Sequence, residues 1–283
     1  MDRQKMEEDQ LRVHGYVLPE HKFIMDYDWE WALTMHHFYD HSFTRKGGLA
    51  PKMRCLCVVV ALCARIPGIE GERYIQNHMG KAMEAGATPS EIVEALECLY
   101  FPCGGPSMLV GVKCLREVLS KQDTGTSSSK DAPSPQSSAE IPLPDEFESD
   151  GSETPEEKQA LIEQMKTTYG PLLPEQEFLI ENNWEWFRRR YRLYTYRFDR
   201  EGALPREMKQ LLIAIATAVR MPGSESARYI KNHLRNALRL GLSKEEIIQA
   251  YESITFPTGG STMMVGIKCL MDLLEEGADG SVS

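Results

Sequence analysis

The sequence predicts an all-α protein, and three observations lead to this prediction. Apolar residues recur with the helical period of about 3.6 residues, as Ile75, Met79 and Ala82 illustrate. The alternation typical of strands, bounded by hairpin turns, is absent. Helix-ending and helix-starting residues follow one another closely, as at Gly86 and Thr88. Together these patterns favour a succession of packed helices.

The chain also repeats itself at an offset of 155 positions. Trp29-Glu30-Trp31 recurs as Trp184-Glu185-Trp186, and the Arg-Tyr-Ile segment that leads to His78 recurs before His233. A repeat of this length corresponds to a whole domain, because solenoid units are only a few dozen residues long. The sequence therefore predicts two tandem copies of one helical domain, with about six helices each.

A change in composition suggests where the two copies end. Residues 121–155 are rich in Ser, Pro, Gly, Asp and Glu. Such a segment cannot bury enough apolar surface to become ordered, so it is expected to be a disordered linker. The two domains are accordingly placed at 10–120 and 165–275.

The helical pattern of the first copy divides it into elements, and the second copy repeats that division. The predicted helices lie at 20–42, 51–65, 70–85, 89–100 and 105–120, after a short lead-in. The second of these is apolar nearly all round and should therefore lie at the centre of the domain. The fourth should begin with a capping box, because Thr88 is followed by Pro89 and Glu91.

Composition excludes several classes of function. The 283 residues carry a formal net charge of −10 and no basic stripe, which argues against nucleic acid as a partner. No stretch of about 18 apolar residues is present, and the charged start lacks an apolar signal core. We therefore expect a cytoplasmic protein without a membrane partner.

The cysteines and histidines do not form a recognisable metal or disulfide pattern. Six of the seven cysteines lie in the first copy, and the copies share no cysteine spacing, so no disulfide framework is expected. Cys55 and Cys57, within an apolar helix, are interpreted as small buried hydrophobes. His37 and His41 have helical spacing, but no acidic or thiol ligand completes a set, and no metal site is predicted.

His78 is the first candidate for chemistry. It shares a helical stripe with Tyr74 and Ala82, so its imidazole should point inward. It could be a core histidine with a hydrogen-bond partner, or an acid–base group. The second copy keeps the arrangement with Tyr229 and His233, which favours a functional role without deciding it.

Two further sets of residues, a pair of arginines and four glycines, remain open between a structural and a functional interpretation. Arg65 and Arg220 end the central apolar helix, where a cation complements the helix dipole but could also hold a substrate carboxylate. Paired glycines precede the last helix of each copy, and their N–H groups could hold an oxyanion or simply allow a sharp turn and close packing. These glycines are Gly104, Gly105, Gly259 and Gly260.

The stretch from Pro51 to Leu119 resembles the carboxymuconolactone decarboxylase family, which also contains the AhpD-like proteins. The resemblance rests on His78, on the segment 80–94 that follows it, and on the small-residue turn at 101–106. In the second copy it rests on a corresponding set: His233, Ala237, Gly241, Leu242, Ser243, Glu246 and Ile247.

This resemblance implies an all-α oligomer, a trimer for a fused two-copy chain, that acts on a small molecule without a cofactor. It implies that His78 and His233 are catalytic. The substrate-binding positions that it suggests are Arg65, Arg220, Tyr74, Tyr229, Gly104, Gly105, Gly259 and Gly260. The peroxidase branch has Cys-x2-Cys-x3-His, but Gly71 and Tyr74 stand at its thiol positions here.

We therefore expect proton-transfer chemistry on a small carboxylated or lactone substrate, most plausibly a decarboxylation. Two alternatives remain open. The first is a thiol peroxidase or oxidoreductase that uses the scattered cysteines. The second is an oligomeric ligand-binding protein without catalysis, in which the histidines are structural.

Overall fold

The computed structural model describes residues 1–14, 17, 19–65, 69–125, 154–169, 172–199, 202–221 and 224–278. Within these residues the regular structure is helical and no strand is present. The all-α prediction is therefore confirmed.

The helices form two compact units, which divide the chain differently from the sequence repeat. The larger unit consists of Met1–Leu119 and Gly202–Ser283, and the smaller unit is Ser120–Glu201. The larger unit thus contains helices from both copies. The predicted domain boundaries at 10–120 and 165–275 concern the repeat and remain a prediction.

Among the described residues, twelve helices begin in the larger unit. From the first copy these are α1 (Arg3–His14), α2 (Pro19–Tyr27), α3 (Trp29–Thr44), α4 (Pro51–Ala64), α5 (Ile69–Glu84), α6 (Pro89–Glu97), α7 (Tyr100–Cys103) and α8 (Gly105–Gly125). From the second copy they are α12 (Arg206–Arg220), α13 (Ser224–Arg239), α14 (Lys244–Thr258) and α15 (Gly260–Ala278).

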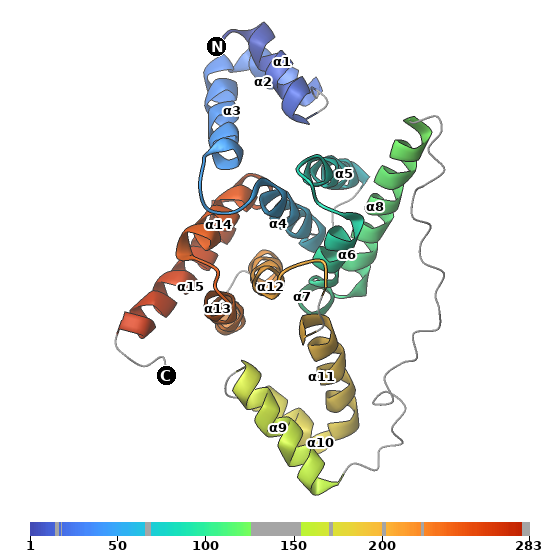
Figure 1. Cartoon of the computed structure of the whole chain (residues 1–283). Coiled ribbons are helices and arrows are strands. Elements are labelled where there is room, and N and C mark those ends of the chain that lie inside the picture. Colours follow the sequence, from blue (N-terminus) through green and yellow to red (C-terminus); the bar gives the residue numbers. More distant parts are fainter. Residues whose placement is uncertain are drawn as a thin grey trace. The chain divides into compact units, whose positions relative to one another are not determined.

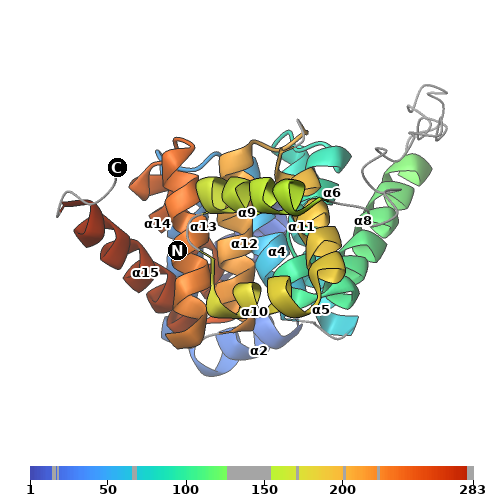
Figure 2. The same ribbon diagram turned by 90° about the horizontal axis from the view of Figure 1, so that it is seen from below.

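The core of the larger unit is built around α4 and α12, the equivalent apolar helices of the two copies. They lie side by side in the middle of this unit (Figures 1 and 2). Leu56 and Val59 on α4, and Leu211 and Ile215 on α12, are completely buried. A helix that is apolar nearly all round is stable only when other helices cover every side of it. The predicted central position of helix 51–65 is therefore confirmed.

Some predicted boundaries were wrong. The expected helix 20–42 is two helices, because the Asp28 side chain accepts a hydrogen bond from the Trp31 N–H and starts α3 anew. The expected helix 89–100 ends at Glu97 and is followed by the short α7. The helix expected to end at residue 120 continues as α8 to Gly125, into the predicted linker. The remainder of that linker up to residue 153 lies outside the described residues.

The helix punctuation was predicted correctly. Thr88 and Glu91 form a reciprocal capping box at the start of α6, and Ser243 and Glu246 form another at the start of α14. Gly86 ends the preceding turn with a φ of 91°, a left-handed conformation that favours glycine.

Residues of the two copies contact each other at two equivalent places, which we call the first and second seams. In the first seam, the Glu94 carboxylate accepts hydrogen bonds from the N–H groups of Ala203 (2.8 Å) and Leu204 (3.0 Å). In the second seam, Gln249 Oε1 accepts one from the Leu49 N–H at 2.5 Å. Glu94 and Gln249 occupy equivalent positions of the repeat.

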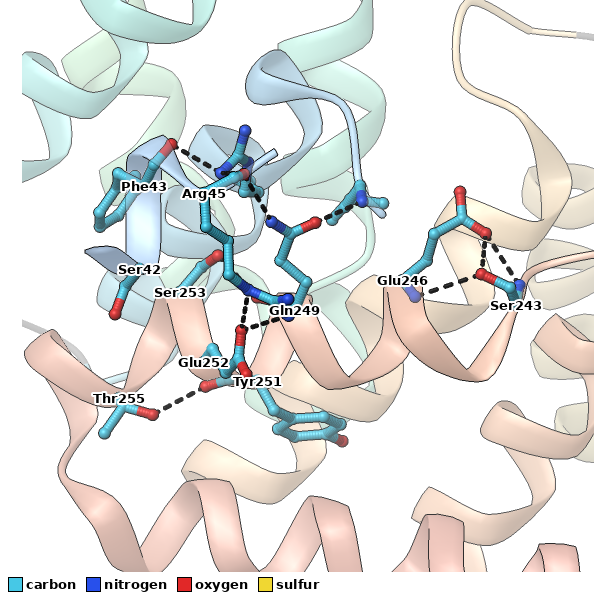
Figure 3. A network of polar contacts seen from close by, with 12 residues as sticks. Ser42, Phe43, Arg45, Ser243, Glu246, Gln249, Tyr251, Glu252, Ser253 and Thr255 are labelled. Carbon is cyan, nitrogen blue, oxygen red and sulfur yellow. Dashed lines mark hydrogen bonds and ion pairs between the residues drawn. The ribbon is translucent and has the colours of Figure 1, made fainter. Parts of the chain in front are cut away.

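The two seams differ in the charged side chains that surround these hydrogen bonds. Lys209 Nζ lies 2.9 Å from Glu94 Oε2, and both side chains are buried. In the second seam, Gln249 Nε2 donates to the Arg45 carbonyl at 3.4 Å, while the Arg45 guanidinium pairs with Glu252 (Figure 3). The first seam therefore depends on a buried ion pair, whereas the second has a neutral amide in the equivalent place.

The smaller unit contains α9 (Pro155–Tyr169), α10 (Pro174–Asn182) and α11 (Trp184–Asp199), drawn in yellow-green to gold in Figure 2. Its buried apolar cluster is formed by Met165, Ile180, Phe187 and Tyr191. These helices correspond in sequence to α1, α2 and α3, where Met6, Met25 and Ala32 form the equivalent cluster.

Candidate functional site

A cavity of about 480 Å³ lies within the larger unit. Its walls come from α1, α2, α3, α4, α5 and α14, so both copies contribute to it. Aromatic side chains form much of the lining, namely Tyr39, Phe43, Tyr74 and Phe256. A cavity with mostly apolar walls and a few polar groups is the usual form of a small-molecule site.

Helical spacing places the polar groups on the cavity wall. On α3, residues His36, Tyr39 and Phe43 follow one another by three and four positions, so they share one face of the helix. On α5, Tyr74 and His78 are four positions apart and line the same cavity. The predicted inward orientation of His78 is confirmed, since only 7% of this residue is exposed.

Aromatic contacts hold these walls together. The rings of Phe43 and His78 lie 5.8 Å apart, and the ring of Tyr39 stacks on Phe43 at 4.6 Å. Phe256 from the second copy approaches Tyr39 edge-on at 5.1 Å. The imidazole of His78 therefore lies at an aromatic wall shared by α3 and α5, and α14 of the other copy completes it.

Lys81 adds a polar contact behind this wall. Its Nζ donates a hydrogen bond to the Tyr39 hydroxyl at 3.2 Å. Burial lowers the pKa of Lys81 to about 8, because the charged ammonium loses hydration. Near neutral pH the Tyr39 hydroxyl thus has a largely cationic neighbour.

Arg65 follows α4 and lies at the cavity with its side chain exposed. Its guanidinium donates a hydrogen bond to the carbonyl of Pro257 from α14. A guanidinium has five N–H donors, so this bond leaves others for a ligand. Both interpretations of Arg65, as a cation at a helix end and as a residue that binds a substrate carboxylate, agree with this position.

The equivalent residues of the second copy are Arg220, Tyr229 and His233. His233 Nδ1 lies 2.8 Å from Gln210 Oε1, whereas the first copy has Cys55 at the position of Gln210. The Tyr229 hydroxyl accepts a hydrogen bond from Arg228 at 3.0 Å. Arg220 ends α12 and is exposed. The structure therefore gathers Arg65, Tyr74 and His78 at one cavity, and none of their counterparts lines it.

The paired glycines are placed at turns. Gly104 and Gly259 have φ values of 82° and 89°, a backbone conformation that residues other than glycine rarely adopt. Gly105 and Gly260 begin α8 and α15. None of the four lines the cavity, although Pro257, shortly before Gly259, does.

Sequence reasoning missed the residues that α1, α2 and α14 bring to the cavity. Gln10, His21 and Phe256 line it, and His36 pairs with Asp9, its Nε2 lying 2.9 Å from Asp9 Oδ2. One signal was available, because the second copy has Gln164, Met165 and Tyr191 where the first has Asp9, Gln10 and His36. A difference between otherwise similar copies marks where their roles can diverge.

The cysteines are free thiols and lie mostly in the core, and the predicted burial of Cys55 and Cys57 is confirmed. Burial raises the pKa of Cys55 to about 11 and raises that of Cys57 still further. Such thiols hold their protons at neutral pH. No group of three or more metal-ligating side chains with metal-site geometry occurs in the described ranges. Nor does the described part of the chain contain a helix long and apolar enough to cross a membrane.

Comparisons with known proteins bear on the family and on the fold. Residues 28–117 match the model of the carboxymuconolactone decarboxylase family. A crystal structure from Burkholderia xenovorans LB400, described as a "putative gamma-carboxymuconolactone decarboxylase subunit", is similar at 21% sequence identity and a TM-score of 0.57. That similarity covers 98% of this chain and 99% of the other, and it bears on the fold alone. A comparison with curated protein sequences gives no match.

The family match begins at the Asp28 cap of α3 and ends within α8, so it spans α3, α4 and α5, which carry Tyr39, Arg65, Tyr74 and His78. The chain is therefore similar to the carboxymuconolactone decarboxylase family over residues 28–117.

Proposed function

We propose that the cavity binds a small carboxylate and catalyses a proton transfer without a cofactor, a decarboxylation in the simplest case. The observation that carries this proposal is the convergence of Arg65, Tyr74 and His78 on one aromatic cavity. A guanidinium holds the carboxylate, and an imidazole can donate a proton at neutral pH.

The reaction needs one proton and no oxidant. The substrate carboxylate leaves as carbon dioxide, and the electrons of the broken carbon–carbon bond pass to the remaining carbon and its conjugated carbonyl. Protonated His78 then donates its proton to that carbon, and a proton from solvent restores the imidazolium. The Tyr39 hydroxyl, with Lys81 at 3.2 Å, could donate a hydrogen bond to the developing oxyanion.

Thiol redox chemistry is less well supported. A reactive cysteine is usually an accessible thiolate with a lowered pKa. Here Cys55, Cys103 and Cys114 each have a pKa raised to about 11 by burial. No cysteine lines the cavity that contains His78.

The test is release of labelled carbon dioxide from a panel of unsaturated and keto carboxylates. A variant with all seven cysteines replaced by Ser or Ala should keep its rate, apart from some loss of stability. His78→Gln combined with His233→Gln should fold and lose about a hundredfold in rate or more, the usual contribution of a general acid. Circular dichroism checks that both variants are folded.

An active double-histidine variant would rule out this mechanism. Loss of peroxide turnover in the cysteine-free variant alone would support the thiol oxidoreductase instead. If a carboxylate binds and is released unchanged, the protein is a binding protein and its histidines are structural.

We further propose that the chain assembles as a trimer. Large aromatic side chains on α2 and α3, including Phe23, Tyr27 and Trp31, are more than half exposed. The smaller unit exposes the equivalent Phe178 and Trp186. Exposed aromatic residues on the same helices of both copies are typical of subunit contacts. A monomer at micromolar concentration in light scattering would contradict this assembly.

A further inference from the structure

The α1 end of the cavity contains a histidine–carboxylate pair that the proposed reaction does not use. His36 lines the cavity and is buried, and its Nε2 lies 2.9 Å from Asp9 Oδ2. When His36 is neutral, Nε2 carries the proton that the carboxylate accepts, and Nδ1 is left as a hydrogen-bond acceptor. The described residues supply no other hydrogen bond or ion pair to the His36 side chain.

A second acceptor belongs to the same end of the cavity. Gln10 lines the cavity with only 4% of its surface exposed. Its Oε1 is buried, and among the residues that the structure describes no donor reaches it. A buried amide oxygen without a donor is costly, by about 1–3 kcal/mol. A ligand that supplies the missing donor would recover this loss.

The second copy shows that the helices equivalent to α1, α2 and α3 can pack without these polar residues. The positions of Asp9, Gln10 and His36 are occupied there by Gln164, Met165 and Tyr191. Met165 and Tyr191 belong to the buried apolar cluster of the smaller unit. The same three-helix arrangement therefore exists with an apolar interior, and the polar set is particular to the first copy.

The position of this polar set relative to His78 limits what can bind. On α3, Phe43 touches the ring of His78 and lies seven residues beyond His36. A helix rises 1.5 Å per residue, so His36 and Phe43 are about 10 Å apart along α3. The two acceptors thus belong to a part of the cavity about two helical turns from the level of His78.

We propose that Gln10 and His36 form a recognition site for a hydroxyl group, so that the substrate is a small hydroxy-carboxylate. Its carboxylate lies at Arg65, its ring or unsaturated body lies against the aromatic walls, and its hydroxyl donates a hydrogen bond to Gln10 Oε1 or His36 Nδ1. Asp9 is a positioning residue, since it holds His36 in the tautomer that accepts. This inference rests on the proposed carboxylate-binding function of the cavity.

Calorimetric titration of the full-length protein with three probes tests the site. The probes are 4-hydroxybenzoate, benzoate and 4-fluorobenzoate, which share the carboxylate and ring but differ in the hydroxyl donor. The wild type should bind 4-hydroxybenzoate about tenfold more tightly than the other two, because one buried hydrogen bond is satisfied. The comparison variant is Asp9→Gln, Gln10→Met and His36→Tyr combined, which copies the second copy and is therefore expected to fold.

In this variant the preference for 4-hydroxybenzoate should disappear, while benzoate binds within about threefold of its wild-type affinity. Equal binding of all three probes by the wild type would overturn the hydroxyl site. So would a preference that survives in the triple variant.

Arg65→Gln separates the two hypotheses. It should weaken all three probes together if the carboxylate lies at Arg65. Probes that bind without a hydroxyl preference but still depend on Arg65 would contradict only the recognition site. Failure of Arg65→Gln to affect any probe would contradict the proposed function itself.

Discussion

The two copies share most of their helix order, although α14 is continuous where the first copy has α6 and α7, and they differ in the polar groups that their helices enclose. The first seam holds a buried carboxylate with a buried lysine, and the second holds an amide at the equivalent place. His78 faces an aromatic cavity, whereas His233 is next to Gln210. Because the backbone plan is shared, these differences show which polar residues the fold can replace. The following variants test that comparison.

The largest effect on stability is expected from Lys209→Met in the first seam. The Glu94 carboxylate would remain buried without its cation, which typically costs about 3–5 kcal/mol. Chemical denaturation of the purified protein measures the change. Arg54→Met is the matched control in the second seam, where the guanidinium donates to the carbonyl oxygens of Phe43 at 2.6 Å and Arg45 at 3.4 Å. Equal losses in the two variants would show that the ion pair gives the first seam no special sensitivity.

The second prediction compares the two histidines singly. His78→Gln should lower the rate of carbon dioxide release by about a hundredfold, since it removes the proton donor from the cavity. His233→Gln should change that rate less than about threefold, because Gln210 already occupies His233 Nδ1. The reverse order would place the active site in the second copy.

The third prediction concerns the pH dependence of the first seam. Burial by itself would raise the pKa of Glu94, but Lys209 and the N–H groups of Leu204 and Ala203 outweigh it and hold that pKa below its usual value. A carboxyl whose pKa is lower in the folded state stabilises the fold above its unfolded pKa, and this contribution is lost as pH falls through the folded pKa.

Glu94→Gln, which copies Gln249, should therefore be less stable than the wild type at pH 7. The difference should shrink as pH falls below the ordinary glutamate pKa of about 4.3 and through the lowered pKa of Glu94. Denaturation curves between pH 3 and pH 7 measure both proteins. A constant difference across this range would show that Glu94 acts through shape rather than charge.

The smallest effect is expected at the two capping boxes, where the copies agree. Thr88→Ala and Ser243→Ala each remove a side-chain acceptor for the N–H of the third helical residue. Each should cost about 1 kcal/mol, the usual value of a helix cap. Thermal unfolding of both variants checks whether the losses match. A marked inequality would mean that α6 and α14 do not contribute equally to the fold.

Much of the fold could be predicted because it depends on neighbours in the sequence. The apolar run that became α4, the box at Thr88 and the stop at Gly86 are local signals, in which a helix is decided by residues a few positions apart. The break at Asp28 was missed, although Asp is a good helix cap, because the aromatic pattern continues across it.

The candidate site was predicted only in part. The inward orientation of His78 follows from the period of its own helix, and the structure confirms it. The residues that face it from α1 and α14 could not be found in this way, because Gln10 and Phe256 reach the cavity from distant parts of the chain.

The sequence by itself determined the all-α class, the two capping boxes and the repeat of sequence at an offset of 155 residues, since these depend on periodicity and on capping over a few residues. Only the tertiary structure decided that α4 and α12 share one core, that Glu94 meets a loop 109 residues further along the chain, and that Asp9 holds His36. Contacts of this kind depend on how buried surfaces fit together. No local pattern specifies which of two similar faces a helix will meet.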